Sequence, residues 1–212
     1  MNEAPSTVDL DLDILEQIEK GSRVLEFACA RGRTAFKLEE LGYSVTAFDI
    51  DPEAITFCRN EAKKRGSKVE FLEADGRNLP FEDSVFDACI MNAYMTMLDT
   101  RDSRIMGFLE GFRVLKEGGY LYLAEFLQTW DDPIYRERYE KHEHITGEKG
   151  TFIATIDGSI EGEEIYRAHH YTEGEIMSLI NSRYHSLIEK RTRFTTYHGN
   201  EIDGIIMLVG KK

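Results

Sequence analysis

The segment that decides the fold runs from Val24 to Arg33 and reads VLEFACARGR. An apolar run leads through an acid into a bend of small residues, and a helix-like segment follows. A strand that feeds such a turn and then a helix N-terminus is typical of the nucleotide-binding corner of a doubly wound α/β sheet. Small residues are needed at the turn because the backbone approaches the ligand closely.

An acid after the next apolar run supports this interpretation. Asp49 follows Val45–Phe48, at the end of the second predicted strand. An acid at this place usually binds the hydroxyls of a ribose. The turn and the acid together indicate a ligand that contains adenosine.

The first motif of the chain resembles that of the class I S-adenosylmethionine-dependent methyltransferases. In that family the motif is an acid followed by Gly-x-Gly-x-Gly, and the matching positions here are Glu26, Ala28, Ala30 and Gly32. Two of the three glycines are therefore alanines. Because alanine has a β-carbon, we expect Ala28 and Ala30 to keep negative φ angles.

Further motifs extend the resemblance over about residues 20–126. Ala74–Gly76, Leu79–Phe81 and Ser84–Asp87 resemble the middle motifs of the family. Phe112–Leu121 strongly resembles its late motif, which precedes strand five. The resemblance implies an α/β fold with a doubly wound, seven-stranded and mostly parallel sheet.

The resemblance also implies a binding site for S-adenosylmethionine at the turn and at Asp49. Glu26 would lie near the methionine end of the cofactor, and Asp49 would accept the ribose hydroxyls. Ile50 would flank the adenine. The alternative for Asp49 is a purely structural role as a helix cap.

Two later strand ends would complete the cofactor site. By the same resemblance, Asp75 would bond the adenine amine with Gly76 beside it. Asn92 and Ala93 would present backbone groups to the methionine part. The alternative for Asp75 is a residue that only stabilises a turn.

The pattern along the chain predicts alternating strands and helices in a single domain, 1–212. Such alternation indicates a parallel sheet with right-handed crossovers. The expected strands are 22–27, 44–49, 68–73, 85–91, 120–126, 184–196 and 203–210. The expected helices are 9–19, 32–41, 51–65, 101–115 and one restarted by Thr172-x-x-Glu175, with the fourth ended by Gly118-Gly119.

Residues 127–171 interrupt this alternation. They predict a helix near 133–143 and a hairpin of Thr151–Ile156 with Glu163–His170. The segment is rich in aromatic and ionisable side chains, so we expect a lid that selects the acceptor. The alternative is an insertion that packs away from the cleft.

The candidate catalytic residues are Tyr94, His169 and His170. Neighbours in a strand point to opposite faces, so we expect only one of the two histidines to face the cleft. The His142-x-His144 pair and the adjacent histidines are not zinc patterns, so no metal site is expected.

Composition limits the class of partner. The 212 residues carry a formal charge of −13, which argues against a nucleic-acid substrate. No apolar run reaches membrane-spanning length and the N-terminus lacks the pattern of a signal peptide. Three cysteines with no clustering indicate reduced thiols, so we expect a cytoplasmic protein.

These observations predict methyl transfer from S-adenosylmethionine to a small-molecule acceptor by in-line displacement, with S-adenosylhomocysteine as product. One alternative is a regulatory protein that binds S-adenosylmethionine without catalysis. The other is a nicotinamide-dependent oxidoreductase, which is disfavoured because the turn lacks Gly-x-Gly-x-x-Gly. The acceptor, the methylated atom and the oligomeric state do not follow from the sequence.

Overall fold

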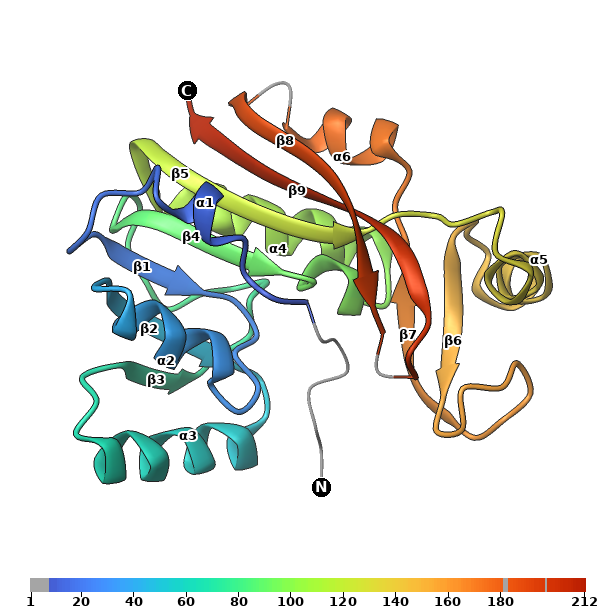
Figure 1. The fold of residues 1–212 in the computed structure, drawn as a ribbon, viewed down its shortest axis with the longest axis horizontal. Coiled ribbons are helices and arrows are strands. Elements are labelled where there is room, and N and C mark those ends of the chain that lie inside the picture. Colours follow the sequence, from blue (N-terminus) through green and yellow to red (C-terminus); the bar gives the residue numbers. More distant parts are fainter. Residues whose placement is uncertain (1–7, 181–182, 197) are drawn as a thin grey trace.

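The computed structural model describes residues 8–180, 183–196 and 198–212. One seven-stranded sheet has the order β3-β2-β1-β4-β5-β9-β8 (Figure 1). Its first five strands are parallel, whereas β9 runs antiparallel to both β5 and β8. The strands are β1 (Arg23–Glu26), β2 (Ser44–Asp49), β3 (Glu70–Glu73), β4 (Phe86–Asn92), β5 (Leu115–Phe126), β8 (Tyr184–Thr195) and β9 (Glu201–Lys211).

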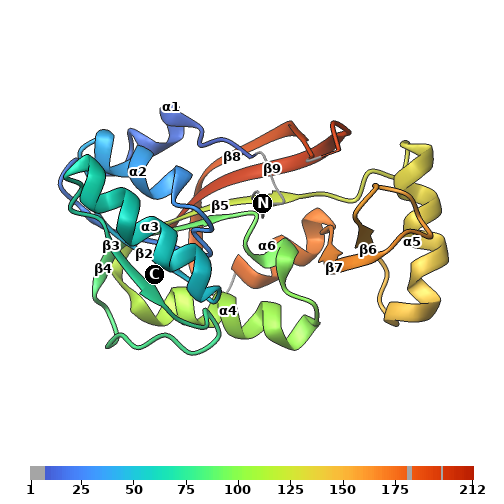
Figure 2. The same ribbon diagram turned by 90° about the horizontal axis from the view of Figure 1, so that it is seen from below.

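Helices cover both faces of this sheet (Figures 1 and 2). One core contains side chains of α1, α2 and α3, and a second core contains side chains of α4 and α6. The predicted doubly wound α/β fold is therefore confirmed. The helices are α1 (Leu12–Leu15), α2 (Arg33–Glu40), α3 (Pro52–Arg65), the 3-10 helix η1 (Met95–Met97), α4 (Arg101–Val114) and α6 (Glu173–Ile180).

Local sequence signals explain where two of these helices begin. The Asp51 carboxylate accepts a hydrogen bond from the Glu53 amide at 2.8 Å, and Pro52 occupies the first position of α3. Before α6, the Glu175 amide donates to Thr172 Oγ1 while the Thr172 amide donates to the Glu175 carboxylate. This reciprocal pair is the predicted capping box.

The predicted helix over 9–19 is wrong in length, because α1 contains only four residues. The Tyr43 hydroxyl donates to the Leu15 carbonyl at 2.8 Å, and the Ile18 amide bonds to the same carbonyl. These bonds hold the chain in turns after α1. Ile14, Leu15 and Ile18 are still buried, as the apolar spacing predicted.

The predicted boundary between α4 and β5 is also wrong. The helix ends at Val114, before Gly118-Gly119, and β5 begins at Leu115. The carbonyls of Arg113 and Val114 accept hydrogen bonds from the Ser84 and Val85 amides. These bonds draw the helix end into the sheet beside β4.

Residues 127–171 form a unit that we call the 127–171 module. It consists of α5 (Pro133–Thr146) and a hairpin of β6 (Thr151–Thr155) and β7 (Glu164–His169), as predicted. Aromatic rings of Tyr135 and Tyr139 on α5 contact the Phe152 ring on β6. The module lies beyond the carboxyl end of β5 and beside the tip of the β8–β9 hairpin (Figure 1).

Candidate functional site

A cavity of about 950 Å³ opens at the carboxyl ends of β1, β2 and β4. Ligands of open α/β sheets bind at this edge. Most of the predicted cofactor-binding residues line the cavity, together with one candidate catalytic residue: Glu26, Ala28, Ala30, Asp49, Ile50, Asp75, Gly76, Asn92, Ala93 and Tyr94. Gly32, His169 and His170 lie outside this lining.

The turn after β1 departs from the expectation of negative φ. Ala28 and Ala30 have φ angles of 52° and 46°, in the left-handed region that glycine occupies without strain. The Ala30 amide donates to Asp49 Oδ2 at 2.7 Å, and the Cys29 amide donates to the Phe48 carbonyl at 2.9 Å. These bonds to β2 hold the alanines in a conformation that their side chains disfavour.

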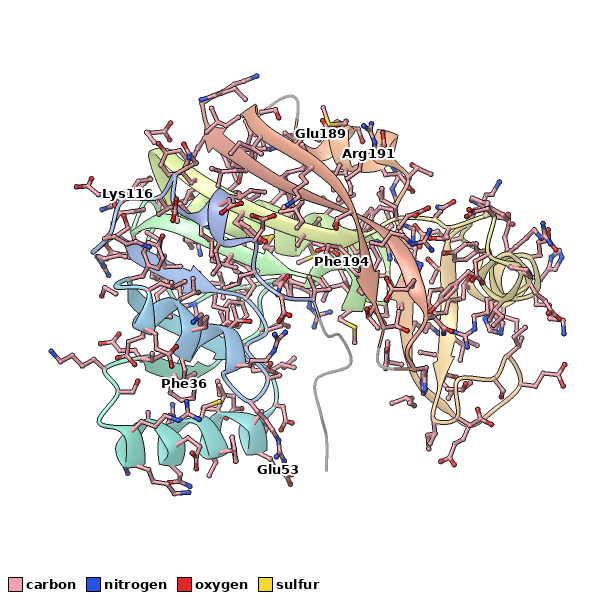
Figure 3. The ribbon with its side chains drawn as sticks, in the orientation of Figure 1. Phe36, Glu53, Lys116, Glu189, Arg191 and Phe194 are labelled. Atoms are coloured by element: carbon pink, nitrogen blue, oxygen red, sulfur yellow. The ribbon has the colours of Figure 1, made fainter. Side chains whose placement is uncertain are left out.

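Gly32 supports the turn from behind. It caps the N-terminus of α2 with a φ of 77°. A β-carbon there would lie 3.0–3.2 Å from Phe36, Cys58 and Phe71. Phe36 lies between α2 and α3 (Figure 3), so a larger side chain at position 32 would meet a packed core. The glycine of the first motif is needed for backbone shape and for packing.

Asp49 lies beneath the turn and retains binding capacity. Asp49 Oδ2 accepts from the Ala30 amide and Asp49 Oδ1 accepts from the Asp51 amide at 3.0 Å. Each carboxylate oxygen has two lone pairs, so each oxygen has one left for a ligand. The helix-cap role belongs to Asp51, which bonds the first turn of α3.

Two acceptor atoms without partners lie in the cavity wall. Glu26 is 3% exposed, and neither its Oε2 nor Asn92 Oδ1 has a hydrogen-bond partner among the described residues. Burial raises the pKa of the Glu26 carboxyl well above its ordinary value. Buried acceptors of this kind are normally satisfied, so the pair is suited to a ligand group that donates hydrogen bonds.

Asp75 lies both in the cavity lining and in a turn that it stabilises. It lines the cavity, and its carboxylate also pairs with the Arg77 guanidinium at 2.7 Å and accepts from the Arg77 amide. Hydrogen bonds from Arg77 lower the pKa of Asp75. Asp75 therefore stabilises its turn and stays charged at the cavity edge.

Tyr94 lines the cavity, and its hydroxyl has no hydrogen-bond partner among the described residues. The ring packs against Phe27 with centroids 5.1 Å apart. The hydroxyl is buried, and a β-carbon at Gly76 or at Gly107 would lie 2.2 Å or 2.6 Å from it. Burial raises the pKa of Tyr94. This placement does not suit a general base.

Both candidate histidines are buried in the 127–171 module and its junction with α6. His169 Nδ1 lies 2.8 Å from Thr151 Oγ1, and the His169 ring also approaches Glu148 and Glu175. The His170 ring stacks on Phe126, and burial lowers its pKa to about 3. Neither histidine lines the cavity and both are buried, so the expectation that one of them faces the acceptor stays a prediction.

Sequence reasoning missed a second group of wall residues, in the segment after β4. Met97 and Leu98 line the cavity, and Glu125 at the end of β5 lies buried against this segment. The position of Glu125 at a strand end was the available signal for that residue, whereas Met97 and Leu98 lie beyond the end of β4. Among the described residues, no helix is long and apolar enough to span a membrane. No cluster of three or more metal-ligating side chains occurs in the same part of the chain.

Comparison with known proteins agrees with this geometry. Residues 24–119 match a family model for a methyltransferase domain. A solved SAM-dependent methyltransferase from Methanosarcina mazei is 34% identical and superposes with a TM-score of 0.91, covering 96% of this chain and 99% of that one. The chain belongs to the class I S-adenosylmethionine-dependent methyltransferase family.

Curated members of the family match about half of this chain. Demethylmenaquinone methyltransferase from Thermus thermophilus is 37% identical over 107 residues, which are 49% of this chain and 47% of that protein. Fatty-acid O-methyltransferase from Mycolicibacterium smegmatis is 33% identical over 116 residues, 54% of this chain and 40% of that protein. The chain spans less than half the length of these two relatives.

The site fits the cofactor of the family. S-adenosylmethionine has an ammonium and two ribose hydroxyls, all of which donate hydrogen bonds. The unpartnered acceptors of Glu26 and Asn92 and the free lone pairs of Asp49 supply matching acceptors on two sides of the cavity.

Proposed function

We propose that this methyltransferase transfers a methyl group from S-adenosylmethionine to a small-molecule acceptor. The observation that carries the proposal is the pair of unpartnered buried acceptors, Glu26 Oε2 and Asn92 Oδ1, in a cavity that also contains Asp49. Nicotinamide cofactors lack the methionine ammonium that these acceptors suit. The curated relatives act on a quinone precursor and on a fatty acid, by their names, which supports a small acceptor.

The residues of the cavity would bind and orient the cofactor. Glu26 and Asn92 hold the ammonium, and Asp49 accepts the two ribose hydroxyls. Ile50 and the turn of Asp75 and Gly76 flank the adenine. Ala93 begins the segment that faces the methionine part.

The main task of the protein in this reaction is to align the acceptor with the methyl group. S-adenosylmethionine supplies a methyl group already activated on a sulfonium, so bond making and bond breaking occur in line at one carbon. The acceptor lone pair forms the new bond to that carbon while the carbon–sulfur electron pair stays on sulfur, giving S-adenosylhomocysteine. The protein holds the acceptor opposite sulfur and keeps water out.

We place the acceptor between this cavity and the 127–171 module. The module lies beyond the carboxyl ends of the parallel strands, on the side where the methionine part would lie (Figure 1). Its helix and hairpin carry further aromatic side chains, among them Tyr135, Tyr139 and Phe152. We propose that the module is a lid that selects the acceptor.

Calorimetry with S-adenosylhomocysteine and with NAD tests the cofactor assignment. S-adenosylhomocysteine should bind the wild-type protein, and Asp49→Ala should weaken binding by at least about tenfold, because charge-assisted hydrogen bonds contribute roughly 1.5–3 kcal/mol each. Asp102→Ala is the matched control, since Asp102 is exposed in the first turn of α4 and does not line the cavity. Binding of NAD without binding of S-adenosylhomocysteine would overturn the proposal.

Removal of residues 127–171 tests the lid. With a short linker in their place, S-adenosylhomocysteine should still bind at reduced strength, while transfer to any acceptor found for the intact protein should be lost. Full transfer activity in the shortened protein would show that the module is not a lid. Binding without transfer across a broad acceptor panel would favour the regulatory alternative.

A further inference from the structure

The cavity wall after β4 is held at one end by a buried carboxylate. Glu125 is 0% exposed, and its carboxylate accepts from the Met95 and Thr96 amides at 2.9 and 3.0 Å. It also accepts from Thr96 Oγ1 at 2.7 Å. Glu125 therefore fixes the start of η1, the short helix that leads to Met97 and Leu98 in the wall.

A buried guanidinium holds the other end of the same segment. Arg104 on α4 is 3% exposed, and its Nη1 donates to the Leu98 carbonyl at 3.1 Å. Leu98 lines the cavity directly after η1. The wall segment 95–98 is thus tied to β5 at its beginning and to α4 at its end.

Arg104 is bound in turn to the 127–171 module. Its Nη2 forms an ion pair with Glu148, which lies between α5 and β6. Glu148 Oε2 accepts from Thr151 Oγ1 at 2.8 Å and lies 3.8 Å from His169 Nδ1. One guanidinium consequently contacts both the cofactor wall and the module.

A contribution to the stability of the fold does not by itself explain the Arg104–Glu148 ion pair. The Arg104 side chain is buried while that of Glu148 is 27% exposed. An ion pair withdrawn from water in this way often contributes no more to stability than apolar residues of the same volume, whereas removal of Glu148 leaves the buried Arg104 charge uncompensated. A planar guanidinium with fixed donors is, however, well suited to hold two groups in a set geometry. The arrangement indicates a positioning role.

We propose that Arg104 and Glu148 are positioning residues that couple the 127–171 module to the Met97–Leu98 wall of the cofactor cavity. The proposal rests on the proposed function of that cavity. When the module is docked, Glu148 holds Arg104 in place and the wall adopts its binding shape. Because coupling between two sites is reciprocal, a ligand that stabilises the docked module also tightens cofactor binding.

Glu148→Gln tests this coupling, with Glu137→Gln as the matched control. Glu137 lies on α5 of the same module, and its pair with Lys141 is exposed and does not contact the wall. We expect Glu148→Gln to weaken S-adenosylhomocysteine binding about five- to tenfold, the scale of indirect coupling effects, and Glu137→Gln to change it less than about twofold. Equal affinities for wild type and Glu148→Gln would overturn the proposal.

Hydrogen exchange supplies a readout that a general loss of stability would not reproduce. In Glu148→Gln, the Met97 and Leu98 amides should exchange faster, while amides of β1 and β2 keep their protection. Glu148→Asp restores the charge and should recover part of the binding and the protection. Uniform loss of protection across the sheet would contradict a positioning role.

One further variant, together with the exchange experiment, keeps the test independent of folding and of the cofactor assignment. Thr151→Val removes the bonds of Thr151 Oγ1 to Glu148 and to His169 Nδ1 but leaves the Arg104–Glu148 pair in place, so it should give a smaller effect of the same kind. If wild type itself fails to bind S-adenosylhomocysteine, the proposed function fails, yet the exchange experiment still decides whether the module and the wall are coupled. An unchanged exchange rate at Met97 and Leu98 in both Glu148→Gln and Thr151→Val would refute the coupling.

Discussion

Ala28 and Ala30 hold a backbone conformation that alanine disfavours, and replacement of each with glycine should stabilise the protein. An L-residue in the left-handed region costs about 1–2 kcal/mol relative to its preferred conformations. Glycine avoids that cost but adds about 0.4–1 kcal/mol of unfolded-state entropy. Mid-range values leave a net gain of about 0.8 kcal/mol per site.

Thermal unfolding of the double variant Ala28→Gly, Ala30→Gly measures this gain. About 1.6 kcal/mol in total corresponds to a rise in Tm of roughly 3–6 °C for a chain of this size. The hydrogen bonds of the turn involve backbone amides, so glycine keeps them. We therefore expect S-adenosylhomocysteine affinity to stay within about threefold of wild type.

The decisive result is whether the glycine variants raise or lower Tm. Ala62→Gly, inside the regular helix α3, should lower stability by about 1 kcal/mol because glycine is a poor helix former. If the turn residues had negative φ angles, their glycine variants would behave in the same way as Ala62→Gly. A fall in Tm for both Ala28→Gly and Ala30→Gly would refute the reasoning that the turn is strained.

Three other predictions follow from buried groups. Burial raises the pKa of Glu125 from 4.5 to about 7, so the folded state holds a proton that the unfolded state has released, and the unfolding free energy should fall as pH rises through this window. Urea titrations at a series of pH values should show that the unfolding free energy depends less on pH in Glu125→Gln than in wild type. The same pH dependence in both proteins would contradict the raised pKa of Glu125. The His170 ring signal should not titrate by NMR between pH 8 and 5, since burial lowers its pKa to about 3, and a midpoint above pH 5 would disprove this. Gly76→Ala should cost about 1–3 kcal/mol because its β-carbon would meet the Tyr94 hydroxyl at 2.2 Å. Tyr94→Phe should restore part of that loss, whereas Gly174→Ala, with open space around it, should not destabilise.

The sequence predicted the features that depend on local pattern. The strand, turn and helix around Val24–Arg33 follow from a run of apolar and small residues, and β4 follows from an apolar run that is covered on both faces. The start of α3 follows from Asp51-Pro52, because a cap and a fixed φ act within one turn. The placement of Asp49 at the cavity follows from its position at a strand end.

The features that the sequence did not predict depend on contacts between distant residues. The φ angles of Ala28 and Ala30 are set by bonds to β2, not by their own preferences. The shortness of α1 depends on the Tyr43 hydroxyl, 28 residues from the Leu15 carbonyl that it bonds. Arg104 and Glu148 are 44 residues apart, and no periodic pattern connects them.

The positions of the three candidate catalytic side chains indicate how the methyl transfer would work. The Tyr94 hydroxyl is buried between Gly76 and Gly107, His170 is neutral inside an aromatic cluster, and His169 is engaged with Thr151. Neither histidine lines the cavity, and burial raises the pKa of Tyr94, which does line it. A sulfonium donor needs a base only when the acceptor loses a proton as it attacks, so for other acceptors alignment and exclusion of water can carry the reaction. A wall held at both ends by Glu125 and Arg104 would supply such alignment. Catalysis would then depend on the geometry of the wall more than on proton transfer.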